Sequence, residues 1–152
     1  MNREILFRGR ALRNTFSISE EEARIKKGDW IYGDLIHFDD GIDLIYERDP
    51  NNSEICGCTG IEVDHKTVGQ YTGIDDNNGV KIFEGDIIRF KYEDYSEYNI
   101  NGYHHPVEII SAVTFEYGEY RIDGYPCRLG SCLDYGDECE FEVIGNIYDK
   151  SK

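Results

Sequence analysis

The sequence EGDIIRFKY, residues 84–92, decides the fold of this chain. Its glycine and aspartate make a tight turn, and the β-branched and aromatic residues after them favour a strand. A second strand is predicted from Val107 to Tyr117, because apolar residues recur there at every second position. Gly118 then turns the chain into a short returning strand. The C-terminal half is therefore predicted to be a β-sheet of hairpins.

A glycine–aspartate turn, an alternating strand and a hairpin, in this order, are typical of small SH3-like barrels. We therefore expect an SH3-like β-barrel part in residues 67–152. The turn Asp75–Gly79 belongs to it, because Asn-Gly supplies a positive φ. The closing strand is predicted at Phe141–Tyr148, with Phe141, Val143 and Ile147 on one face.

The same sequence pattern recurs in the N-terminal half. Lys27–Ile31 is again a glycine–aspartate turn before a strand, and Trp30, Tyr32, Ile36 and Phe38 fall on one face of that strand at period two. Residues 39–41 (Asp-Asp-Gly) predict a hairpin into Ile42–Glu47. Residues 1–66 are thus expected to form a further β-rich part. Its one helical element would be a short turn over residues 17–27, so the chain is expected to be mainly β with at most one short helix.

Charge and composition restrict the class of partner. The net charge is −15, with 8 basic against 12 acidic residues in 1–60 and 8 against 19 in 61–152. Such a field repels phosphate backbones and anionic lipid, so direct nucleic-acid and membrane partners are not expected. The basic residues Arg3, Arg8, Arg10 and Arg13 favour a solvated or edge strand over a nucleic-acid arm. No run approaches the roughly 20 apolar residues of a membrane span, and the first residues lack the apolar core of a signal peptide. We therefore expect a cytoplasmic protein whose five cysteines are free thiols.

Cys56 and Cys58, with His65, are the strongest metal candidates in the sequence. Zinc sites built from cysteine pairs usually separate the two thiolates by two or more residues, and a second pair is lacking here. Cysteines acting as small buried apolar residues explain the pattern better. We therefore expect no metal, no cofactor and no catalytic residue, with these three side chains kept as the alternative.

Tyrosines interleaved with acidic residues suggest a binding segment. Tyrosine is large, rigid and amphipathic, which suits protein interfaces. The candidates for partner binding are Tyr92, Tyr95, Tyr98 and Tyr103. The alternative is a strand extension and a loop that pack on their own barrel.

Four stretches of the chain together resemble the YopX family of phage and prophage proteins. They follow in order and reach both ends: Arg3–Gly9, Gly28–Leu35, Val68–Ile88 and Glu142–Tyr148. The third stretch is the most specific because it runs without a gap. The resemblance implies a phage or prophage origin, a β-rich fold and self-association, and it supplies no catalytic residues.

The main hypothesis is a non-enzymatic accessory protein that associates with itself or binds a host or phage protein in the host cytoplasm. A homo-oligomer is expected because apolar side chains occupy both faces of single strands: Ile31 and Leu35 lie opposite Tyr32 and Ile36. One alternative is an acidic DNA mimic that inhibits a host nucleic-acid-binding protein, for which Glu138–Glu142 gives only one short carboxylate row. Another is a metal-dependent hydrolase, which needs a carboxylate and histidine cluster that sequence order does not reveal.

Overall fold

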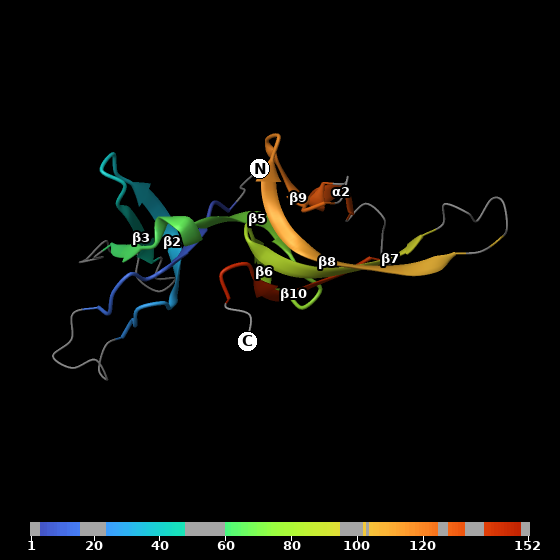
Figure 1. The fold of residues 1–152 in the computed structure, drawn as a ribbon, viewed down its shortest axis with the longest axis horizontal. Helices are drawn as coiled ribbons and strands as arrows, with labels where there is room; N and C mark the ends of the chain where they lie inside the picture. The colour runs from blue at the N-terminus through green and yellow to red at the C-terminus, as the bar shows by residue number, and fades with distance from the viewer. Residues whose placement is uncertain are drawn as a thin grey trace. The chain divides into compact units, whose positions relative to one another are not determined.

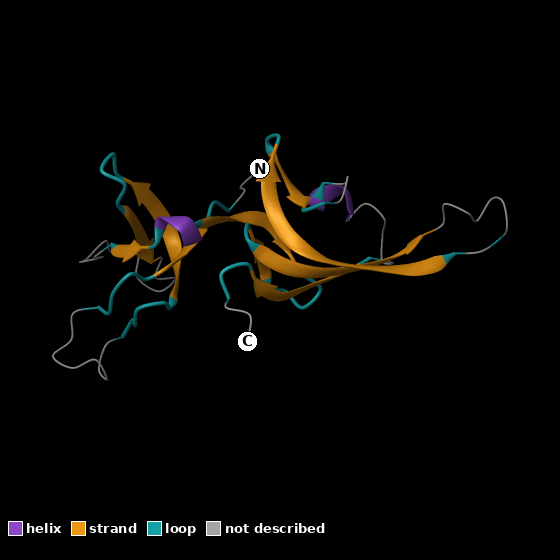
Figure 2. Ribbon diagram, in the orientation of Figure 1, coloured by secondary structure: helices purple, strands orange, loops and turns teal. Residues whose placement is uncertain are grey.

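The computed structural model of the chain describes residues 4–15, 24–47, 60–94, 102, 104–124, 128–132 and 139–149, with the backbone alone at 131 and 132. Strands make up most of the regular structure in these residues, which confirms the mainly β fold (Figure 2). The chain divides into two compact units, Met1–Tyr71 and Thr72–Lys152. We refer to them as unit 1 and unit 2 and describe each by itself.

Helical structure in the described residues is limited to two short pieces. These are a 3-10 turn, η1 (His65–Thr67), and one α-helix, α2 (Leu129–Cys132). The helical turn expected over residues 17–27 falls mostly outside the described residues, and residues 24–27, which are described, are not helical. None of the described helices is long and apolar enough to cross a bilayer.

Unit 1 contains the strands β4-β3-β2-β1-β5, in this order, of an antiparallel sheet whose last strand is β6 (Lys81–Phe83). Figure 1 labels β2, β3 and β5 among them. The strands are β1 (Phe7–Arg10), β2 (Trp30–His37), β3 (Asp43–Glu47), β4 (Ile61–Val63) and the beginning of β5 (Gly69–Asp75). The alternation predicted for β2 is confirmed, since Ile31 is buried and Tyr32 is exposed. The core of unit 1 consists of Ala11, Ile25, Ile31, Ile45 and Val63. One face of the sheet is therefore covered and the other faces outward.

Unit 2 contains the long strands of the chain. They are β6 (Lys81–Phe83), β7 (Asp86–Asp94), β8 (His105–Glu116), β9 (Glu119–Ile122) and β10 (Glu140–Asn146). The order β10-β7-β8-β9 places β7 at the centre of a four-stranded antiparallel sheet. Phe90 of β7 lies in the core, stacked on Phe141 at 4.8 Å and on Tyr92 at 5.1 Å between ring centroids. The core is completed by Ile82, Ile88, Val113, Ile122, Leu129 and Cys139.

The two glycine–aspartate turns share one geometry. Gly28 and Gly85 have φ angles of 92° and 84°, which a side chain would strain. In each turn the following aspartate accepts a hydrogen bond from the amide three residues earlier, at 2.9 Å for Asp29 and 2.8 Å for Asp86. The two turns thus start β2 and β7 in the same way, as the sequence predicts.

The turn between β5 and β6 is held by a buried carboxylate. Asp76 accepts hydrogen bonds from the amides of Asn78 and Val80, both at 2.8 Å, through Oδ1. Its Oδ2 accepts from the amide of Val143 in β10 at 3.1 Å. The interpretation of these residues as a turn is confirmed, and Gly79 has the expected positive φ of 79°. Asp76 also joins this turn to the last strand.

The last strand differs from the sequence prediction. β10 ends at Asn146, and its pairing with β7 shifts between Val143 and Gly145. This bulge interrupts the alternation, so Ile147 lies in the following turn and is exposed instead of sharing the face of Phe141. The strand order is compatible with an SH3-like barrel, and its closure stays a prediction.

Candidate functional site: the two faces of the β2–β3 hairpin

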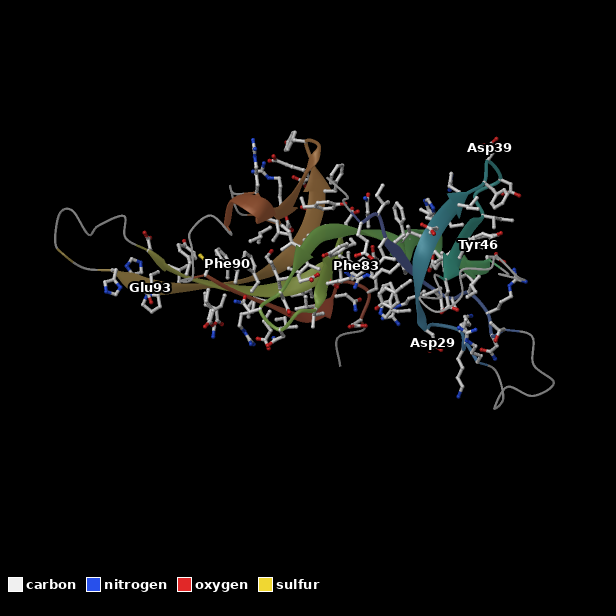
Figure 3. The ribbon with its side chains drawn as sticks, turned by 180° about the vertical axis from the view of Figure 1, so that it is seen from behind. Asp29, Asp39, Tyr46, Phe83, Phe90 and Glu93 are labelled. Atoms are coloured by element: carbon white, nitrogen blue, oxygen red, sulfur yellow. The ribbon has the colours of Figure 1, made fainter. Side chains whose placement is uncertain are left out.

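The hairpin of β2 and β3 is closed by the turn predicted at residues 39–41. The amide of Gly41 donates to the carbonyl of Phe38 at 2.9 Å, and the amide of Phe38 donates to the carbonyl of Ile42 at 2.9 Å. Gly41 has a φ of 84°, which suits a three-residue loop of this kind. Asp39, at the end of the hairpin, is labelled in Figure 3. The register that follows pairs His37 with Asp43 and fixes which side chains share a face.

The outward face of the hairpin end carries two rows of apolar side chains. Ile36 of β2 pairs with Leu44 of β3, and Phe38 and Ile42 extend the rows toward the turn. Ile36 and Phe38 are each 43% exposed and Ile42 is 39% exposed. We name Ile36, Phe38, Ile42 and Leu44 the hairpin patch. Apolar side chains that gather on one exposed face are typical of an interaction surface.

The core-facing side of the same hairpin end carries a polar cluster. Nδ1 of His37 lies 2.5 Å from Oδ1 of Asp43, and Nδ1 of His65 lies 2.8 Å from Oδ2. Asp43 is only 3% exposed, whereas the histidine side chains are 56% and 69% exposed. The imidazole rings are 5.9 Å apart between centroids and tilted by 38°. We name His37, Asp43 and His65 the histidine–aspartate cluster.

A short capped turn positions His65. Asp64 caps η1 by accepting from the amide of Lys66 at 3.1 Å. The hydroxyl of Thr67 donates to the carbonyl of Asp64 at 2.7 Å and accepts from the amide of Arg10 in β1 at 2.9 Å. These bonds tie the turn to the sheet, so His65 is held beside the end of β3.

Two opposing effects act on the carboxyl of Asp43. Burial is the largest single effect and raises its pKa, because a charge loses hydration in the interior. The hydrogen bonds from His37 and His65, and the charges on their rings, lower the pKa, and together they outweigh burial. The net result is a pKa below the ordinary value. An ionised carboxylate can only accept, so each Nδ1 atom donates its proton to Asp43.

The metal candidates of the sequence analysis are divided by the structure. Cys56 and Cys58 lie outside the described residues. His65 is described, and its neighbours are His37 and Asp43, which sequence reasoning missed. A signal for this pair was present, because a loop centred on Asp40 places positions 37 and 43 opposite each other. The position of His65 had no comparable signal.

The tyrosine candidates for partner binding are only partly described. Tyr95, Tyr98 and Tyr103 lie outside the described residues. Tyr92 is half-buried and packs on the core of unit 2 through its stacking with Phe90. For this residue the geometry favours the alternative of packing on its own sheet. Partner binding by the segment stays a prediction.

The basic residues near the N-terminus are engaged within unit 1. The guanidinium carbons of Arg8 and Arg10 lie 4.6 and 4.7 Å from the ring centre of Trp30. Arg13 forms an ion pair with Glu62. These contacts favour a structural role for Arg8, Arg10 and Arg13. The expected solvated or edge strand is wrong for β1, because β1 lies between β2 and β5 and Arg8 is only 5% exposed.

The fold and the site define a small, mainly β protein made of two sheet units, in which an apolar hairpin face is backed by a histidine–aspartate cluster. The family model described as YopX protein matches residues 24–152. The chain therefore belongs to the YopX family, as the resemblance predicts. A search of curated proteins gives no match for the chain.

Proposed function

We propose that this YopX-family chain is a non-enzymatic accessory protein of a phage or prophage, which works in the host cytoplasm as a self-associating β module. The interface is the hairpin patch, and the occupant is the hairpin patch of a second copy. Two identical surfaces can pair about a twofold axis, which is the commonest symmetry of soluble oligomers.

The exposure of Ile36, Phe38 and Ile42, beside half-buried Leu44, is the observation that supports this proposal. Its four members form two neighbouring rows, and each of the rows Ile36–Phe38 and Ile42–Leu44 contributes an aliphatic or aromatic side chain at every second position. None of the four carries a charge. Burying these four side chains against their copies removes apolar area from water and brings no charge of their own into the interface.

The outward face of unit 2 offers a contrast that strengthens the choice of interface. Arg89 of β7 forms an ion pair with Glu142 of β10 at 2.6 Å, and Lys91 lies 3.8 Å from Glu108 of β8. The exposed Ile110 of β8 pairs with Arg89 and lies two residues after Glu108 on the same strand. A face of interleaved ions is costly to bury, so the hairpin patch is the better surface for a second copy.

The same ion pairs weigh against the alternative of a DNA mimic. A mimic needs a row of carboxylates that a basic groove can reach. Glu138 lies outside the described residues, Glu140 lies opposite Lys91 in the register of β10 with β7, and Glu142 is already bound to Arg89. A neutralised carboxylate contributes little to an imitation of phosphates, and no further observation favours this function.

The charge of the chain sets the salt dependence of association. Each copy carries a net charge of −15, so two copies repel each other at low ionic strength. Salt screens this repulsion and leaves apolar burial intact. The oligomer is therefore expected to strengthen as the salt concentration rises.

Light scattering coupled to gel filtration tests the proposal. The full chain, at tens of micromolar, is expected to show a mass of at least twice 17.6 kDa in about 0.5 M salt, with a larger share of monomer in low salt. A mass of 17.6 kDa at both salt concentrations would refute self-association.

Two matched variants locate the interface. Ile36→Lys with Phe38→Lys places charges in the hairpin patch and is expected to give a monomer at high salt. Ile110→Lys changes an even more exposed isoleucine of unit 2 and is expected to leave the oligomer intact. Circular dichroism checks that both variants keep the β-fold. An oligomer that survives the double substitution would show that another surface is used.

A further inference from the structure

We propose that His37, Asp43 and His65 form a binding site for one divalent transition-metal cation, of which Zn²⁺ is the best fit. This site is separate from the hairpin patch, because it lies on the opposite face of the same hairpin end. The inference therefore stands or fails independently of self-association. It also departs from the sequence-based expectation that the chain needs no metal.

The first support is the convergence of three separate elements. His37 ends β2, Asp43 begins β3, and His65 begins η1, twenty-two residues after Asp43. The antiparallel register fixes the first pair, and the capped turn tied to β1 fixes the third member. Three metal-ligating side chains meet here through tertiary structure and not through sequence proximity.

The second support is distance. One ligand atom from each side chain can be chosen so that all three lie within 4.8 Å of one another. Zinc binds nitrogen and oxygen at about 2.0–2.1 Å, so two ligands of a tetrahedral site lie roughly 3.3 Å apart. The present Nδ1–oxygen contacts are 2.5 and 2.8 Å. The two carboxylate–imidazole contacts must therefore lengthen by less than about 1 Å, and the exposed imidazoles can do this by rotating while the buried aspartate stays in place.

The third support is the chemistry of the donor set. Two imidazoles and one carboxylate suit zinc and its neighbours in the transition series, whereas Mg²⁺ and Ca²⁺ prefer oxygen ligands alone. Three protein ligands are also the number found where zinc keeps an open coordination position. Both histidines are exposed on the solvent side, so water can complete the shell. The charge of −15 further favours cations at the surface of the chain.

A purely structural cluster is the competing explanation. In that case each Nδ1–H donates to Asp43 and no cation binds. The two explanations differ in what happens when zinc is added. With a cation site, each coordinating imidazole nitrogen gives its lone pair to the metal and the ring carries its proton on the other nitrogen, so binding depends on both histidines.

Isothermal titration of the full chain with ZnCl₂, after chelator treatment and dialysis, tests the site. The expected result is one zinc ion per chain, with no binding of Mg²⁺ or Ca²⁺ at the same concentrations. His37→Ala and His65→Ala are each expected to weaken zinc binding at least tenfold. His104→Ala is the matched control, because His104 is also exposed and hydrogen-bonded to a carboxylate, that of Glu93 at 2.9 Å, and it should bind zinc like the parent chain.

The cysteines need their own control, since thiolates also bind zinc. In the Cys56→Ser/Cys58→Ser background, stoichiometric binding that still requires His37 and His65 supports the proposed site. Three outcomes would overturn it: no stoichiometric binding, binding that is unchanged by both histidine variants, or binding that disappears with the two cysteines. Circular dichroism confirms that each variant is folded.

Discussion

Asp76 of unit 2 and Asp43 of unit 1 are both buried, and they satisfy their carboxylates in different ways. Asp76 of unit 2 is 7% exposed and accepts from the backbone amides of Asn78, Val80 and Val143. Asp43 of unit 1 is 3% exposed and accepts from two histidine side chains. Both carboxylates are paired, as buried charges must be. The two carboxylates differ in whether their hydrogen-bond donors can move away.

The difference separates a structural role from an exchangeable site. A backbone amide inside a turn cannot turn away without breaking the turn, so the partners of Asp76 are permanent. An exposed imidazole can rotate about its side-chain bonds at little cost, so the partners of Asp43 can give way to a ligand. A buried acid with mobile, metal-ligating partners is thus the better candidate for binding than a buried acid held by the backbone.

Gly33→Ala is expected to have the largest effect, because it breaks the hairpin that carries Asp43. A Cβ atom on Gly33 would lie only 1.9 Å from the carbonyl oxygen of Tyr46, so β2 and β3 would have to separate. We expect a loss of about 3 kcal/mol in the free energy of unfolding, measured with urea. Gly145→Ala is the control, since its Cβ atom meets nothing within 4 Å. Equal stability of the two variants would contradict the packing described for the hairpin.

Asp76→Asn comes next in size. The amide group replaces one accepting oxygen by a donor, so at least one of the amides of Asn78, Val80 and Val143 loses its partner. A buried amide without a partner, and the loss of a charged acceptor, should lower the stability by about 2 kcal/mol in urea. We expect the hydrogen bond that joins the β5–β6 turn to β10 to be the one that is lost. Hydrogen exchange of the Val143 amide that stays as slow as in the parent would argue against this.

Asp43→Asn should cost less than Asp76→Asn, although Asp43 is the more buried of the two. The histidines can rotate or change the nitrogen that carries the proton, so they can adapt to an amide. We expect a loss of about 1 kcal/mol, measured in urea with chelator present. A loss of stability as large as that of Asp76→Asn would mean that the two histidine side chains are held as rigidly as the backbone amides that bind Asp76.

A substitution of Glu84 is expected to have the smallest effect on stability, and this effect should depend on the pH. Burial raises the pKa of Glu84, the opposite direction to the net shift at Asp43. Because the folded chain favours the protonated form of Glu84, the contribution of this group to the free energy of unfolding is present in full below the ordinary pKa of 4.5. It is lost as the pH rises through the pKa of Glu84 in the folded chain. Glu84→Gln is therefore expected to stabilise the chain at pH 7 and to give no gain near pH 4, measured as the change in urea midpoint. The same gain at both pH values would show that burial of the charge is not its cause.

The local part of the fold could be predicted from the sequence. The turn at residues 39–41 and the glycine–aspartate turns depend on single residues with special backbone angles. The alternation of Ile31 and Tyr32 between opposite faces follows from the period of two along β2. These features depend on neighbours along the chain, so their sequence signals are strong.

The site itself could be predicted only in part. The pairing of His37 with Asp43 follows from the hairpin, but the approach of His65 depends on β4 pairing with β3 after the long segment 48–59. No pattern in the sequence determines that pairing. The bulge in β10 escaped prediction for a similar reason, because Ile144 is an ordinary strand residue and only the register with β7 displaces it.

The long-range contact between Asp76 and Val143 bears on the order in which a growing chain can fold. The two residues are sixty-seven positions apart, and β10 is a neighbour of β7 in the sheet of unit 2. During synthesis from the N-terminus, strands β1 to β4 of unit 1 are all available once Val63 has left the ribosome, whereas the sheet of unit 2 lacks a strand until Asn146 follows. At about 5–20 residues per second, β7 and β8 wait for seconds with an open edge. The charged side chains of the ion pairs on their outward face then protect this open edge, because charged residues on an edge strand oppose pairing with other nascent chains.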